Sequence, residues 1–257
     1  MQSCSSAIPP GGVQPSDRLE RPGLEDWYRR AGKLAPWFGW TAALSFAAAV
    51  CLVFAAAPTE SIRGEHHRIA FIHGPATWIS VLLYLLTTGS AAFGLITRQR
   101  LSSMLASALA PTGAMFAFVA LWTVSLWGKP VWGVWWIWDA HLSSELLLLF
   151  LFLGFIALRE AIDDNSRADR ATGVLGLAGL VALPVLHVSV RWWTSHQGLT
   201  FPYLRITAGS GVTGFVTMMT MSVSLACYAL AAALTRLRVV ILERERNATW
   251  VSREQLP

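Results

Sequence analysis

The sequence predicts an all-α, polytopic integral membrane protein with six transmembrane helices and a Trp-rich amphipathic segment on its outer face. Of the 257 residues, 54% are hydrophobic and only 14% are charged, whereas a soluble domain carries about 25% charged residues. Six long stretches are almost free of charge. A soluble fold of this length needs many more polar surface positions. These observations exclude an ordinary cytosolic enzyme, a disordered chain and a disulfide-stapled secreted domain.

Each of the six stretches is long enough for a spanning helix, which needs about 20 apolar residues. Five of them contain no Asp, Glu, Lys or Arg, and the fourth contains only Glu145. In chain order they cover residues 34–59, 69–97, 101–128, 140–158, 171–190 and 206–235. The first stretch and its leader are too long for a cleaved signal peptide, so we expect a retained first helix.

The membrane domain is expected to cover residues 34–236, between two tails. Residues 1–33 are polar and rich in Pro and Gly, which is typical of a disordered tail. Residues 237–257 are expected to form a basic tail. One set of loops and tails contains 15 of the 20 Lys and Arg residues. The positive-inside rule therefore places both termini in the cytoplasm, and it accounts for the basic residues without any nucleic-acid partner.

All six His residues lie at or near the expected outer face: His66, His67, His73, His141, His187 and His196. Imidazole is a common ligand of metals and of haem iron. For any single His, a solvated or hydrogen-bonded interfacial side chain is the simpler interpretation. Glu145 follows His141 by four residues, so both lie on one helical face, and the simpler role of Glu145 is to orient that His or to face the bundle.

Residues 127–141 contain more Trp than a membrane-interface belt requires. A belt accounts for one or two Trp at each helix end, but here Trp132, Trp135, Trp136 and Trp138 precede Asp139 within one connecting segment. We expect an amphipathic segment at the membrane surface. Its indoles would form an apolar platform for a large flat ligand, with Asp139 at the polar edge.

The motif at residues 132–146 (WGVWWIWDAHLSSEL) resembles the tryptophan-rich signature of the haem-handling WWD family. Residues 71–78 (FIHGPATW) and 190–198 (VRWWTSHQG) are similar to its two haem-ligand blocks. Length and span count resemble those of the haem exporter protein C family of the cytochrome c maturation (system I) pathway. The resemblance covers roughly residues 37–250.

The resemblance implies a non-covalent b-type haem with His73 and His196 as axial ligands and the Trp segment as its platform. The second block is one residue shorter than usual, so His187 is an alternative ligand. His141 stands where the family usually has Arg. Residues that could contact the propionates or support the ligands are Arg68, Lys129, His141, Glu145, Arg191 and Arg205.

The resemblance also implies a transport component of the bacterial inner membrane rather than an enzyme. Its partners would be a periplasmic haem chaperone, the membrane and ATPase subunits of an ABC transporter, and a small single-span protein. The chain has no Walker A motif, so ATP hydrolysis would belong to another subunit. The alternatives are a bis-His electron-transfer cytochrome, which the lack of His near the inner face disfavours, and a scaffold without haem. A third alternative is an intramembrane serine protease. Residues 208–211 (AGSG) do not match its G-x-S-G pattern, which disfavours this class.

Overall fold

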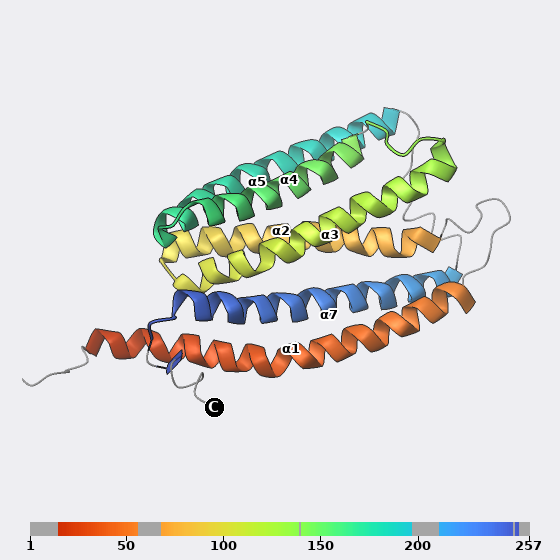
Figure 1. Cartoon of the computed structure of the whole chain (residues 1–257). Helices are drawn as coiled ribbons and strands as arrows, with labels where there is room; N and C mark the ends of the chain where they lie inside the picture. The colour runs from red at the N-terminus through yellow and green to blue at the C-terminus, as the bar shows by residue number, and fades with distance from the viewer. Residues whose placement is uncertain (1–14, 56–67, 139, 197–210, 249, 252–257) are drawn as a thin grey trace, which may run out of the picture.

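The computed structural model describes residues 15–55, 68–138, 140–196, 211–248 and 250–251, and these form an all-α bundle. Its helices are α1 (Pro15–Ala55), α2 (Ala70–Thr97), α3 (Arg100–Trp132), α4 (Ala140–Ala161), α5 (Asn165–His196) and α7 (Gly211–Arg244). Figure 1 shows three layers of paired helices, with α2 and α3 between the α4–α5 pair and the α1–α7 pair. Successive helices alternate in direction, so the chain turns at two opposite ends of the bundle.

The prediction of a polytopic all-α membrane protein is confirmed. Within the described residues, five helices are long and apolar enough to cross a membrane: Gly23–Phe54, Ala70–Thr97, Arg100–Pro130, His141–Ala161 and Val212–Arg244. The remaining expected span corresponds to α5, which has 32 residues but is not among these five. Its side chains from residue 182 onward lie outside the described part of the chain.

α3 is the central helix. In the 18-residue apolar stretch of α3, 67% of the residues are buried, whereas 17% are buried in the corresponding stretch of α1. The buried face of α3 consists largely of alanine, at positions 106, 108, 110, 114, 117 and 120. Small residues allow transmembrane helices to approach closely. Gly113 shows this directly, because the fully buried ring of Phe152 from α4 lies where a Cβ atom at this position would stand.

The expectation of a disordered tail over residues 1–33 is wrong for residues 15–33, which belong to α1. Pro15 occupies the first helical position, where its missing N–H costs nothing. Further along, Glu25 and Arg29 form an i,i+4 ion pair of 2.8 Å. Ala31 is buried, at 1% exposure, so this part of α1 packs against the protein. Residues 1–14 lie outside the described residues.

The boundary expected at residue 236 is also wrong, because α7 continues to Arg244. Beyond it the chain folds back, and Trp250 and Val251 are buried in a cluster with Met104 and Ile241. The Trp250 ring lies 5.6 Å from that of Tyr28 on α1. The C-terminal segment therefore packs onto α1, α3 and α7.

α1 and α7 make up one of the two outer layers, and they form the most extensive helix pair in the bundle. Ser224 on α7 donates a hydrogen bond of 3.0 Å to the carbonyl oxygen of Ala42. On its other side α1 exposes large apolar side chains, including Trp37, Trp40 and Leu44. Such a face is suited to contact with lipid.

Replacing Gly113 by Ala should weaken the contact between α3 and α4, because the added methyl group overlaps the Phe152 ring. We expect the free energy of unfolding to fall by about 1–3 kcal/mol. Tryptophan fluorescence during thermal unfolding of the detergent-solubilised protein measures this. Gly89→Ala is the matched control, since nothing lies within 4 Å of its Cβ position. Equal stability of the two variants would contradict the close packing.

Candidate functional site

His73 lies in the first turns of α2, at the end of the bundle where α3 finishes. Its Nδ1 lies 3.1 Å from the carbonyl oxygen of Ala120 and 3.3 Å from Oγ1 of Thr123, both on α3. A carbonyl oxygen only accepts hydrogen bonds, so Nδ1 carries the proton and donates it. Nε2 of His73 is then the unprotonated nitrogen, which is the arrangement found in metal-ligating histidines.

His141 begins α4 beside His73. The two imidazole rings are 6.2 Å apart between centroids and are nearly perpendicular. The side chain of His141 is exposed. The structure thus brings together two of the expected imidazoles from helices α2 and α4.

Glu145 lies one turn after His141 on α4 and is buried, at 6% exposure. The hydroxyl of Ser80 on α2 lies 3.3 Å from Oε1 of Glu145 and 2.8 Å from the carbonyl oxygen of Thr77, and these two acceptors share its one proton. Glu145 therefore links α4 to α2 below the His73–His141 pair. Sequence reasoning missed Ser80, although His73, Thr77, Ser80 and Tyr84 recur at the spacing of one helical face.

The segment expected to be one amphipathic element is divided into three parts. Trp127 and Trp132 lie in the last turns of α3, with ring centroids 5.1 Å apart. Gly133 then ends the helix with a positive φ of 77°, a conformation that glycine adopts without strain. Residues 133–138 are irregular, and α4 begins at Ala140. The structure thus divides residues 127–141 between the end of α3, an irregular connection and the start of α4.

The irregular part exposes indole surface. Trp135 is 56% and Trp138 79% exposed. Trp136 packs edge-on against Trp138, with centroids 5.5 Å apart. Its Nε1 is buried and has no hydrogen-bond partner among the described residues, which is unusual for a buried donor.

Two of the cations expected near the site, Lys129 and Arg68, each lie over an aromatic ring. Lys129 donates a hydrogen bond of 3.0 Å to the carbonyl oxygen of Gly133, and its Nζ lies 5.8 Å from the centre of the Trp135 ring. Lys129 therefore lies within the Trp segment. Arg68 lies just before α2, with its guanidinium 4.8 Å from the centre of the Phe54 ring of α1.

The remaining predicted site residues are not tested by the structure. Asp139 and Arg205 lie outside the described residues. His187, Arg191 and His196 belong to α5, but their side chains lie outside the description. Positions 187 and 196 are nine residues apart, which corresponds to about two and a half helical turns, so they lie on opposite faces of α5.

The arrangement suits a ligand with a metal-binding centre, a flat apolar body and acidic substituents. His73 supplies an oriented imidazole, the exposed indoles supply apolar area, and Lys129 and the Trp136 N–H supply donors. Within the described residues no cluster of three or more His, Cys, Asp or Glu could hold a bare metal ion.

Comparison with known proteins gives a consistent picture. Residues 20–252 match the family model described as "Heme exporter protein C". The protein of that name from Escherichia coli strain K12 is 39% identical over 234 residues, covering 88% of this chain and 91% of the relative. Those from Haemophilus influenzae and Paracoccus denitrificans are 33% and 32% identical over 228 residues, each covering 88% of this chain, and 92% and 93% of the relatives.

Replacing Ser80 by Ala should destabilise the protein, because it removes the hydroxyl that is shared between the buried Glu145 carboxyl group and the Thr77 carbonyl oxygen. An unsatisfied buried acceptor costs about 1–3 kcal/mol, and we expect the unfolding free energy to fall by that amount. Thermal unfolding followed by circular dichroism measures the change. Ser144→Ala is the control, since that hydroxyl bonds only the His141 carbonyl oxygen of its own helix. A stable Ser80→Ala protein would show that the Ser80–Glu145 contact is not structural.

Proposed function

The chain belongs to the haem exporter protein C family, and on that premise we propose how this multi-pass transport component of cytochrome c maturation handles haem. It holds one non-covalent b-type haem at the end of the bundle that carries His73 and the Trp segment, and delivers it to a periplasmic haem chaperone. The observation that carries this proposal is the hydrogen bond from His73 Nδ1 to the Ala120 carbonyl oxygen. It leaves Nε2 available for iron beside exposed indole surface.

His73 is the first axial ligand in this proposal. Hydrogen bonding of the other ring nitrogen fixes the tautomer and the ring orientation of a ligating His and raises its basicity. Ala120 and Thr123 provide this support from α3, and the rigid packing of α3 holds both in place.

His196 is the second axial ligand. It is the last residue of α5, and α5 ends at the same end of the bundle as the Trp segment (Figure 1). His187 is the alternative ligand, about 13 Å earlier along the helix axis. Because the two positions lie on opposite faces of α5, the proposal assigns only one of them to the haem iron.

The Trp segment forms the haem platform and the docking surface for the chaperone. Exposed aromatic area at Trp132, Trp135 and Trp138 contributes about 25 cal/mol for each Å² that a ligand covers. The unpartnered Nε1–H of Trp136 and the ammonium group of Lys129 donate to the haem propionates. Asp139 is assigned to the polar edge, and Arg68, Arg191 and Arg205 to further propionate contacts.

His141 and Glu145 support the ligands rather than bind iron in this proposal. His141 lies against His73, and Glu145 fixes the register of α4 against α2 through Ser80. An exposed imidazole at position 141 also offers a hydrogen-bond donor to a propionate.

The orientation follows from the charge distribution. Most of the Lys and Arg residues lie at one end of the bundle, which contains the α2–α3 turn, the α4–α5 turn, the start of α1 and the end of α7. This end therefore faces the cytoplasmic side of a bacterial inner membrane. The haem end then faces the periplasm. The partners are the membrane and ATPase subunits of an ABC transporter, which supply ATP hydrolysis, and a small single-span membrane protein.

Replacing either axial ligand by Ala should abolish the low-spin haem spectrum of the purified protein, because six-coordination requires both imidazoles. His73→Ala and His196→Ala are the test variants, and His66→Ala is the control. Absorbance spectra and a pyridine haemochrome assay measure haem content. Loss of haem in His187→Ala with retention in His196→Ala would reverse the assignment of the second ligand.

Replacing Trp136 and Trp138 together by Ala should reduce haem content and co-purification of the haem-loaded chaperone. Each anchor of such an interface contributes about 2 kcal/mol or more. Both residues lie in the irregular segment between α3 and α4, so membrane insertion and expression should be unchanged. Wild-type levels of haem and chaperone in the double variant would show that the segment only anchors the protein at the membrane surface.

A further inference from the structure

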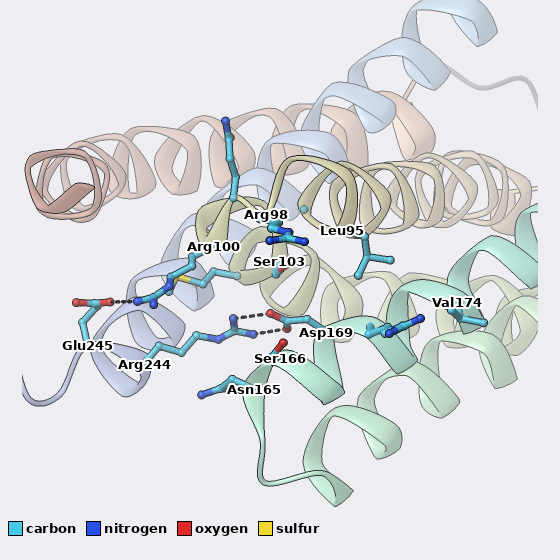
Figure 2. A pocket seen from close by; sticks show the side chains of 14 residues that line it. Leu95, Arg98, Arg100, Ser103, Asn165, Ser166, Asp169, Val174, Arg244 and Glu245 are labelled. Carbon is cyan, nitrogen blue, oxygen red and sulfur yellow. Dashed lines mark hydrogen bonds and ion pairs between the residues drawn. The ribbon is translucent and has the colours of Figure 1, made fainter. Parts of the chain in front are cut away.

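A cavity of about 900 Å³ lies at the end of the bundle opposite to His73, where α2 turns into α3 and α5 begins (Figure 2). Four arginines line it, against two carboxylates, Asp169 and Glu245. The lining arginines are Arg98, Arg100, Arg170 and Arg244. The haem proposal uses none of these residues, and the excess of positive charge favours an anionic ligand.

Asp169 does not neutralise the whole cavity, because both of its oxygens are already bound. Arg244 donates to them at 2.8 and 3.1 Å, and Arg159 donates at 3.0 Å (Figure 2 draws the Arg244 pair). The side chains of Arg159, Asp169 and Arg244 are only 10–18% exposed. This network joins α4, α5 and α7 into a fixed wall. The Nε–H of Arg244 is buried and has no acceptor in the part of the chain that the structure describes.

Two lining guanidiniums have no partner among the described residues. Arg98 and Arg170 are exposed at the cavity and make no hydrogen bond or ion pair there. Arg98 is the C-cap residue of α2, and its backbone has the left-handed conformation with a φ of 56°. Arg100 has only a 4.0 Å contact with Glu245.

The start of α3 adds further donors. Gln99 occupies its N-cap position without a side-chain cap hydrogen bond, so the first N–H groups of α3 are not satisfied by a cap at the cavity. Together with the guanidiniums, a helix start without a side-chain cap favours a phosphate or other anion.

The cavity also has an apolar side. Leu95 and Val174 line it from α2 and α5, and Val174 is 59% exposed. Leu95 lies in a membrane-spanning helix, and Val174 lies at the start of the apolar part of α5. A free phosphate would use only the cationic side. A phospholipid uses both sides, because its acyl chains continue from the headgroup into the bilayer.

We propose that this cavity binds the headgroup phosphate of an anionic membrane phospholipid. Arg98 and Arg170 contact the phosphate, and the acyl chains pass along Leu95 and Val174. Arginine suits this role because its guanidinium donates two parallel hydrogen bonds to a phosphate. The bound lipid joins the ends of α2, α3 and α5. This site is independent of haem binding at the other end of the bundle.

Native mass spectrometry of the full-length detergent-purified protein, titrated with phosphatidylglycerol, tests this proposal. The wild type should retain the lipid. Arg98→Gln combined with Arg170→Gln should weaken binding by about tenfold or more, since both guanidinium donors to the phosphate are lost. Arg167→Gln combined with Arg236→Gln is the matched control. It removes the same charge from exposed residues at the same end, outside the cavity lining, and should bind as the wild type does.

Three results would overturn the proposal. Equal weakening in both double variants would show non-specific charge attraction. Displacement of the lipid by millimolar inorganic phosphate would identify a site for free anions. Displacement by hemin would identify a carboxylate ligand in place of a phospholipid.

A photoactivatable phosphatidylglycerol tests the wild-type protein without any substitution. We expect labelling of peptides containing residues 95–104 and 165–174. Labelling confined to other parts of the chain would also contradict the proposal.

Discussion

The close approach of α3 to its neighbours is the constraint on which the other features depend. Apolar side chains gain little by moving from lipid to protein, so helix association in a membrane depends on packing and on interhelical hydrogen bonds. The alanines of α3 and Gly113 remove side-chain bulk from its contacts with α2, α4 and α7. The short distance between backbones then brings the Ala120 carbonyl oxygen within reach of His73. The same small-residue face thus supports the bundle and orients the imidazole.

The helical architecture was largely predictable from the sequence, whereas the helix ends were not. Runs without charge report which residues can contact lipid, and three of the expected spans coincide within four residues with α2, α3 and α4, while a fourth overlaps most of α7. They do not report where a helix ends in water. α1 begins in a charged region, and α3 continues through Lys129 until Gly133 ends it. The C-terminal segment folds back because Trp250 and Val251 find an apolar cluster that a local pattern does not reveal.

The candidate site was predictable in its residue types but not in its supporting contacts. The clustering of all six His and many Trp indicated one face of the molecule, and the family resemblance then singled out His73 and the Trp segment. The structure brings His73 and His141 together. The partners of His73 and Glu145 were missed because a backbone carbonyl such as that of Ala120 has no sequence signature. The cationic cavity at the other end was missed for a related reason. Its arginines had been counted only as determinants of orientation, although their positions near the ends of four helices, α2, α3, α5 and α7, give them a second role.

The pairing of α1 with α7 has a consequence for biosynthesis. α1 is the first helix to leave the ribosome, and its main packing partner begins 156 residues after α1 ends, at Gly211. At a synthesis rate of about 5–20 residues per second, α1 waits roughly 10 to 30 seconds in the bilayer before α7 arrives. During that time only lipid or another protein covers the face that will receive Ser224. The α1–α7 layer of the bundle therefore assembles last. A nascent chain that stalls before α7 leaves α1, the first helix made, without its main packing partner.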